Sequence, residues 1–142
     1  MSRHALLRLA LIPMVAMLQA TAHGATACAP GFTEFLQDFE QARIDRDQHT
    51  KFPLRYTAID GGAPMPRNKT SWLDRDEARK VQAFPSPAYQ AELGLQRKIS
   101  KDKAGRCEVF LFIPESDMYV VTFTFSRWNK TWRLVAVADQ SL

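Results

Sequence analysis

The chain has 142 residues and a formal net charge of +4, a length that accommodates one domain of ordinary size. Without Arg3 and Arg8, which precede the expected mature chain, 17 of the 19 basic residues stand against 15 acidic ones, a net charge near +2. Nucleic-acid binders usually cluster Lys and Arg in a stripe. The charges here alternate in sign, which argues against a nucleic-acid partner.

The first 24 residues are typical of a secretory signal peptide. Arg3 and Arg8 make its positive start, and an uncharged apolar stretch, 9–18, follows them. Small residues then offer cleavage sites. We favour cleavage after Ala22, and positions up to Ala27 stay open. The apolar run is much shorter than the roughly 20 residues that span a bilayer, so no membrane span is predicted.

Two cysteines, Cys28 and Cys107, follow the signal. An even pair in an exported chain predicts one disulfide, and their wide separation is unlike the paired spacing of zinc sites. A bacterial lipid anchor on Cys28 is disfavoured, because Ala25 stands where such signals usually have Leu. We therefore expect a periplasmic or secreted protein whose single domain covers 28–142.

The first half of the mature chain predicts helices and one strand. Phe32, Phe35, Leu36 and Phe39 recur on one helical face, which predicts a helix over 32–47. Alternation predicts a strand over 52–58, placed at a sheet edge because Pro53 has no N–H to donate. A Gly- and Pro-rich loop follows at 60–66. Further helices are predicted over 74–83, with an Asp74–Glu77 capping box, and over 88–93.

The second half predicts four strands separated by short polar breaks, which form an antiparallel meander. The strands are expected near 95–100, 107–113, 118–127 and 131–138. The fold class is therefore α+β, with the N-terminal helices packed on one face of a curved antiparallel sheet. The expected core includes Phe35, Phe39, Leu111, Val121, Phe123 and Leu134.

The last strands also carry apolar residues on the second face of the sheet. Strict alternation puts Phe110 and Phe112 there, and Val135 and Val137 with them. Apolar area left in water usually marks an interface. We expect these four residues to contact a protein partner or a second copy of the chain, unless the sheet curls and covers them.

The order of elements resembles the cone-shaped superfamily of nuclear transport factor 2. The resemblance rests on the Phe-rich first helix, on Phe52-Pro53-Leu54 just after it, and on the closing pattern Phe123-Thr124-Phe125 with Trp132-Arg133-Leu134. Within that superfamily the chain is similar to small exported bacterial proteins of a domain-of-unknown-function family. The resemblance implies a cavity between the concave face of the sheet and the helices, and dimerisation through the sheet. It implies no particular activity.

Candidate chemical groups are few. His49 at the end of a polar helix is more typical of a solvated terminus than of a triad, and no Gly-x-Ser-x-Gly elbow accompanies it. No metal site, cofactor or catalytic residue is predicted. Tyr56, Asp60 and His49 are the expected pocket residues, and Asp60 or Asp139 would supply the carboxylate if the domain were an enzyme.

Three functions fit this sequence. The first is a non-catalytic exported domain that binds a ligand or a protein. The second is an inhibitor or immunity-type partner of a toxic enzyme, and the third is a small enzyme that uses a pocket carboxylate. Small size, export and the lack of a catalytic motif fit the first two equally, and we prefer the first as the more general.

Overall fold

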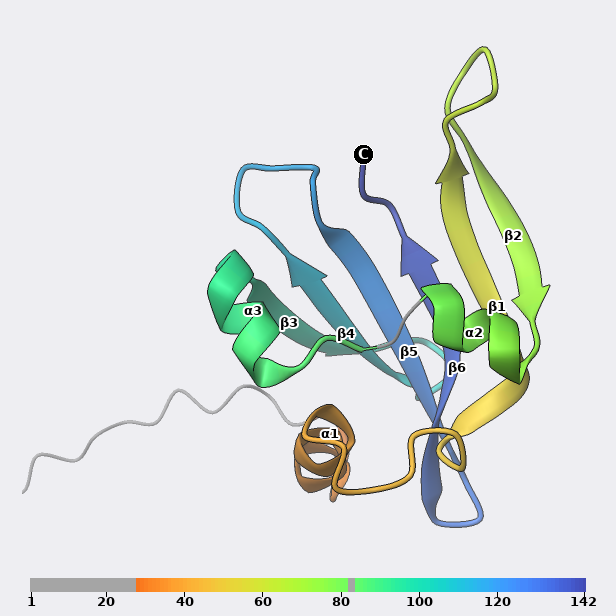
Figure 1. The fold of residues 1–142 in the computed structure, drawn as a ribbon. Helices are drawn as coiled ribbons and strands as arrows, with labels where there is room; N and C mark the ends of the chain where they lie inside the picture. The colour runs from red at the N-terminus through yellow and green to blue at the C-terminus, as the bar shows by residue number, and fades with distance from the viewer. Residues whose placement is uncertain (1–27, 82–83) are drawn as a thin grey trace, which may run out of the picture.

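The computed structural model describes residues 28–81 and 84–142. The predicted signal peptide, 1–24, lies outside these residues. These residues form three helices and six strands, and the last four strands follow one another without an intervening helix (Figure 1). In chain order they are α1 (Phe32–Glu40), β1 (Thr50–Asp60), β2 (Arg67–Leu73), α2 (Arg75–Val81), α3 (Pro87–Leu93), β3 (Gln96–Lys101), β4 (Cys107–Phe112), β5 (Val120–Trp128) and β6 (Thr131–Asp139).

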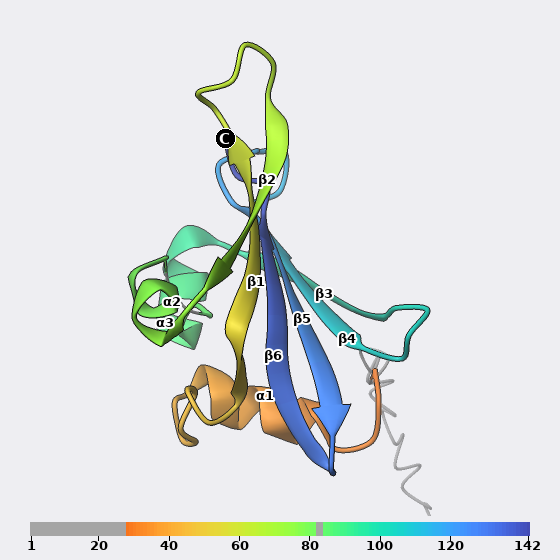
Figure 2. The same cartoon turned by 90° about the vertical axis from the view of Figure 1, so that its right-hand side faces the viewer.

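The six strands form one twisted sheet in the order β2-β1-β6-β5-β4-β3. The predicted meander is confirmed, since β3, β4, β5 and β6 are sequential antiparallel neighbours. The sheet is nevertheless mixed, because β6 returns alongside β1 in the parallel direction. A parallel pair needs a long connection, and here the chain between β1 and β6 supplies it. Figure 2 shows α2 and α3 on one side of the sheet and α1 across its lower end.

The edge position predicted for the first strand is wrong. β1 lies between β2 and β6, and Pro53 is tolerated because it falls where pairing is interrupted. The register with β6 shifts between Thr50 and Arg55, and pairing with β2 begins only at Leu54. The missing N–H of Pro53 therefore costs no ladder hydrogen bond. β2 itself was not predicted, because most of its residues are polar and exposed.

The first helix is shorter than predicted and ends at Glu40 instead of 47. The capping signals of the other two helices hold. The N–H of Asp74 donates to Glu77 and the N–H of Glu77 donates to Asp74, at 3.0 and 2.9 Å, which is the predicted capping box. Ser86 caps α3 by accepting from the Tyr89 N–H, and Gly94 closes it in the left-handed conformation.

The core lies between the helices and one face of the sheet. Five of the six predicted core residues are buried, and Phe35 is half-buried against them. Phe39 packs edge-on against Phe84 and Phe125, so the aromatic stripe of α1 fills the concave side of the sheet. The largest fully buried side chains are Phe32, Phe39, Phe84, Phe123, Phe125 and Leu111.

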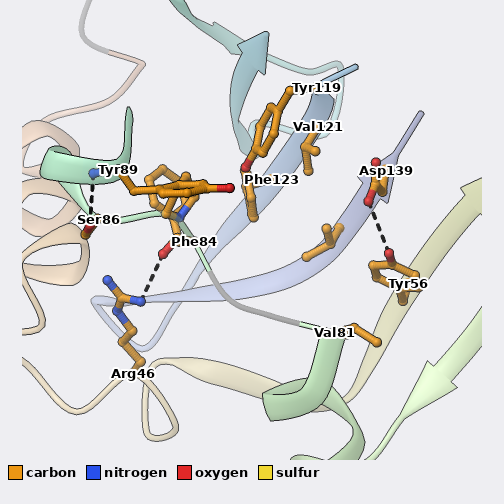
Figure 3. A pocket seen from close by; sticks show the side chains of 12 residues that line it. Arg46, Tyr56, Val81, Phe84, Ser86, Tyr89, Tyr119, Val121, Phe123 and Asp139 are labelled. Carbon is orange, nitrogen blue, oxygen red and sulfur yellow. Dashed lines mark hydrogen bonds between the residues drawn. The ribbon is translucent and has the colours of Figure 1, made fainter. Parts of the chain in front are cut away.

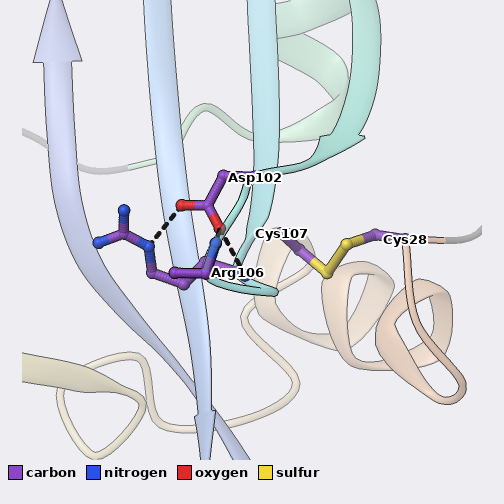
Figure 4. Close-up of a disulfide and its surroundings, with 5 residues drawn as sticks. Cys28, Asp102, Arg106 and Cys107 are labelled. Atoms are coloured by element: carbon purple, nitrogen blue, oxygen red, sulfur yellow. Dashed lines mark hydrogen bonds and ion pairs between the residues drawn. A yellow bond between two sulfur atoms is a disulfide. The ribbon is translucent and has the colours of Figure 1, made fainter.

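Cys28 and Cys107 form the expected disulfide, with Cα atoms 5.7 Å apart (Figure 4). The bond ties the segment before α1 to the first residue of β4, across 79 residues of sequence. The adjacent turn is held by Asp102, which accepts from Arg106 Nε at 2.5 Å and from the Arg106 N–H at 2.8 Å. The disulfide thus fastens α1 to the outer half of the meander.

Titration of the unreduced, unfolded mature protein with a thiol reagent should detect no free thiol. Both sulfurs are engaged in one bond, so the reagent should react fully only after a reductant is added. Two reactive thiols without reductant would contradict the pairing.

Candidate functional site

A cavity of about 520 Å³ opens between the concave face of the sheet and residues 84–86, which precede α3 (Figure 3). Its floor is apolar and formed by Val121, Phe123 and Val137, and Phe84 lies across from it. A second hollow of about 210 Å³ lies next to it under α2. The two share six lining residues, which are Arg46, Tyr56, Val81, Phe84, Phe123 and Val137.

All three tyrosines of the chain line this cavity, although they come from three separate elements. Tyr56 projects from β1, where it pairs with Val137 of β6. Tyr119 lies just before β5, and Tyr89 lies in the first turn of α3, where the Ser86 cap fixes its position. Three hydroxyl groups therefore surround an apolar floor.

Asp139 is the one carboxylate among the described lining residues. It is the last residue of β6, and its Oδ2 accepts from the Tyr56 hydroxyl at 3.3 Å. Its Oδ1 accepts from the Ser141 N–H at 3.0 Å. Asp139 is half-buried, and these two hydrogen bonds hold its carboxylate in place. Each carboxylate oxygen can accept one more hydrogen bond, which a molecule in the cavity could donate.

The cavity raises the pKa of two of its tyrosines. Burial raises the pKa of Tyr56, and the neighbouring Asp139 carboxylate raises it further through its charge and the hydrogen bond. Burial raises the pKa of Tyr119 to about 12, with smaller contributions from Asp139 and Tyr89. Both hydroxyls therefore stay protonated at neutral pH and act as hydrogen-bond donors.

The raised pKa of Tyr119 predicts a loss of stability in alkali. In the unfolded chain a tyrosine has a pKa near 10, whereas folded Tyr119 keeps its proton until about pH 12. The raised pKa therefore contributes fully to the free energy of unfolding below pH 10, and this contribution is lost as the pH rises towards 12. Tyr119→Phe should lose less free energy of unfolding than the unmodified protein between about pH 9 and pH 11. Urea denaturation at both pH values measures the difference. Equal losses in the two proteins would contradict the assignment.

Arg46 lines the cavity but its guanidinium is already engaged. It donates to the backbone oxygens of Phe39, Glu40 and Phe84 at 2.7, 2.6 and 3.0 Å. Burial lowers the pKa of Arg46, and the nearby Glu40 carboxylate opposes that shift. Its role is to join the end of α1 to Phe84, and so to shape the cavity wall.

Of the three predicted pocket residues, only Tyr56 lines this cavity. Asp60 lies at the far end of β1, where it pairs with Arg67 at 3.8 Å and accepts from the Gly62 N–H. His49 precedes β1, with Nδ1 3.0 Å from the Trp132 backbone oxygen, and faces a shallow outer hollow instead. Asp60 and His49 lie at opposite ends of β1, whereas Tyr56 lies within it. The three residues are close in sequence, but an 11-residue strand is extended and holds its two ends far apart.

The sequence reasoning did not assign Tyr89, Tyr119 or Arg46 to the site. A tyrosine that begins an alternating apolar strand, as Tyr119 does before Val121 and Phe123, is a usable signal. It marks a polar group at the rim of a core face. Tyr89 follows a recognisable helix cap by three residues, but nothing in the sequence says which face that helix presents.

The predicted interface residues do not share one face. Phe110 and Phe112 lie half-buried on the outer face, with rings stacked 4.9 Å apart. Placing Val137 with them is wrong, because Val137 is buried in the core and lines the cavity. Pairing skips Val135, which is bulged out of the β5–β6 register, and this reverses the alternation beyond it.

Residues 28–81 and 84–142 contain no group of three or more metal-ligating side chains close enough to hold an ion. Within the same residues, none of the helices has the length and apolar character needed to cross a membrane.

No protein-family model matches the sequence, and a search of curated proteins gives no match. Among solved structures, the chain is similar to a nuclear transport factor 2-like protein from Bacteroides fragilis, with a TM-score of 0.59. The chain has the nuclear transport factor 2-like fold. The two sequences are 19% identical over 78% of this chain, so the likeness shows the fold and no activity.

The resemblance to the nuclear transport factor 2-like superfamily that the sequence indicated is confirmed at the level of the fold. The chain spans about half the length of the Bacteroides fragilis protein, since the match covers 47% of it. In this fold the tyrosine-lined cavity occupies the space between the concave sheet and the helices.

Proposed function

We propose that this protein is an exported, non-catalytic binding domain that holds a small molecule in the tyrosine-lined cavity. The observation that carries the proposal is the convergence of all three tyrosines and one carboxylate on a single apolar floor. A cavity of about 520 Å³ falls within the range of small-molecule sites, and apolar walls with a few fixed polar groups are their usual composition.

The polar groups restrict the chemistry of the ligand. The Tyr56 hydroxyl donates its one proton to Asp139, so Tyr119 is a protonated donor towards a ligand and Asp139 is an acceptor with negative charge. Arg46 has three of its donors engaged with the backbone, so Asp139 is the charged lining group with free hydrogen-bonding capacity, and it favours an amine-like or other hydrogen-bond-donating group. A ligand with an aromatic or aliphatic body and one amine-like group matches this arrangement.

Export of the domain is part of this proposal. The Cys28–Cys107 disulfide supports it, because such bonds persist mainly outside the cytosol. Residues 1–24 support export too, because a positively charged start, an apolar stretch and small residues follow one another in the order of a signal peptide. The mass of the chain recovered from periplasm should correspond to cleavage after Ala22, or at one of the alternative sites up to Ala27.

The ligand class is tested by screening small amines with aromatic or aliphatic bodies against the mature, disulfide-bonded protein by thermal shift. Compounds that raise the melting temperature should bind Asp139→Asn about tenfold more weakly, because the charge that attracts them is lost. Tyr56→Phe should weaken them by a smaller factor, since it removes one hydroxyl.

Asp60→Asn is the matched control, because it removes the same charge outside the cavity. It should leave the affinities unchanged. The proposal fails if no compound in the set stabilises the protein, or if Asp139→Asn and Asp60→Asn weaken binding equally. Turnover of a bound compound that disappears in Asp139→Asn would instead favour the enzyme hypothesis, which rests on Asp139 now that Asp60 is outside the cavity.

The second candidate is association through the outer face, with another copy or with a protein such as a toxic enzyme that the domain inhibits. The stacked rings of Phe110 and Phe112 favour it, because none of α1, α2 and α3 covers that side of the sheet (Figure 2). Phe110→Asp with Val135→Asp should convert an oligomer to a folded monomer by light scattering. An unmodified domain that is monomeric at high concentration would remove the support for self-association.

A further inference from the structure

The outer face of the sheet carries a second feature that the tyrosine-lined cavity does not explain. Two hollows lie there, of about 400 and 160 Å³, and they share Lys51 and Val135 in their linings. We refer to the two together as the basic groove. Its cations come from four separate strands or turns and are Lys51, Arg55, Arg106, Arg127 and Arg133.

The charge of the basic groove has one sign. Neither hollow is lined by an acidic side chain. Of the five groove cations, only Arg106 forms an ion pair within the described residues, and its partner is Asp102. Glu108 lies on the same face of the sheet but does not line either hollow. Four uncompensated cations at one place attract an anionic partner.

Exposed indole rings lie in both parts of the basic groove. Trp72 of β2 is 63% exposed and Trp128 at the end of β5 is 65% exposed, which is unusual for the largest apolar side chain. The Arg133 guanidinium lies over the Trp128 ring at 5.7 Å. Flat aromatic faces beside cations suit a partner whose units are themselves rings, since ring faces stack on indole.

Arg133 also has an unsatisfied donor. Its Nε is buried and has no hydrogen-bond acceptor among residues 28–81 and 84–142. A buried donor without an acceptor is unfavourable. A carboxylate bound in the groove would pair with the Arg133 guanidinium where it lines the hollow.

We infer that the basic groove binds an acidic polysaccharide. Its sugar rings stack on Trp72 and Trp128, and its carboxylates pair with Lys51, Arg55 and Arg133. An acidic peptide has matching charge but no repeating ring for the two indoles. Single-stranded nucleic acid has both, but the Cys28–Cys107 disulfide is typical of compartments outside the cytosol, which disfavours it. The site is separate from the tyrosine-lined cavity, so either proposal can fail without the other.

Isothermal titration of the mature, disulfide-bonded protein with oligogalacturonate tests the inference. We expect binding that weakens by about tenfold or more from low to physiological ionic strength, because salt screens exposed charges. Trp72→Ala and Trp128→Ala should each weaken binding about tenfold. Trp72→Phe, which retains a flat ring, should recover most of the loss.

Two double variants that remove the same charge show whether binding depends on the groove itself or only on the net charge of the protein. Lys51→Gln with Arg55→Gln should weaken binding about tenfold or more. Arg43→Gln with Lys69→Gln removes the same charge from exposed positions outside the groove and should have little effect. Unchanged denaturation midpoints verify that all variants fold.

Three results would overturn the inference. Equal losses of affinity in the two charge variants would mean that the net charge of the protein alone attracts the oligogalacturonate. Poly-glutamate binding as tightly as oligogalacturonate would identify an acidic protein segment as the partner. An oligothymidylate that binds more tightly would identify single-stranded nucleic acid. A neutral oligosaccharide of the same length should not bind.

Discussion

Replacing Phe39 with alanine is expected to lower the free energy of unfolding by about 3–5 kcal/mol. The side chain is 1% exposed, and its ring lies 5.3 Å from that of Phe125, 5.6 Å from Phe35 and 6.0 Å from Phe84. Truncation leaves a ring-sized void between α1 and the sheet that these neighbours cannot fill. Urea denaturation of the disulfide-bonded mature protein measures the loss as a lower midpoint with an unchanged m-value.

Two further variants make this prediction specific. Phe39→Leu retains apolar volume and should cost less than the alanine change, because the void is smaller. Met118→Ala alters a side chain that is 75% exposed and should change stability by no more than about 0.5 kcal/mol. If Phe39→Ala behaved like Met118→Ala, the close packing of α1 on the sheet would be wrong.

The parts of the fold that sequence reasoning anticipated depend on short-range signals. Apolar residues at helical spacing identified α1, and an Asp74–Glu77 pair and a Ser86-Pro87 start identified the other two helices. The meander followed from four alternating runs joined by short breaks. Each signal is local, so one chain segment is enough to interpret it.

The errors arose where neighbours in space override the local pattern. Pro53 is compatible with an inner strand only because the β1–β6 register shifts around it. The end of α1 at Glu40 depends on Arg46, whose side chain returns to the last carbonyls of the helix. Val135 is skipped in the β5–β6 pairing, so the residues of β6 that follow it point to the opposite face from the one that strict alternation predicts. None of these partners can be identified from sequence spacing.

The candidate site follows the same rule. Tyr56 and Asp139 are 83 residues apart, and they meet because β1 and β6 are parallel neighbours. The sequence offered Tyr56 and Asp139 as separate candidates without a reason to join them. The alternating signs of the charges likewise concealed the basic groove, because Lys51, Arg55 and Arg133 come together only when β6 lies beside β1.

Replacing Arg46 with methionine is expected to lower the free energy of unfolding by about 2–4 kcal/mol. Methionine retains an unbranched apolar side chain of similar length but leaves the backbone oxygens of Phe39, Glu40 and Phe84 without their charged donor. Hydrogen bonds to a charged group contribute about 1.5–3 kcal/mol each, and half-burial of Arg46 reduces their sum. Urea denaturation measures the loss, and hydrogen exchange should accelerate at the end of α1.

Arg46→Lys separates charge from geometry. A single ammonium cannot reproduce a planar fork that reaches two elements, so this variant should recover only part of the loss. Arg43→Met is the nearby control, since Arg43 is exposed and makes one ion pair with Asp38 at 3.6 Å. Because Arg46 fixes Phe84 against the cavity, Arg46→Met should also weaken any ligand that Asp139 binds, whereas Arg43→Met should not. Full stability in Arg46→Lys would contradict this role, because it would mean that positive charge alone joins α1 to the cavity wall.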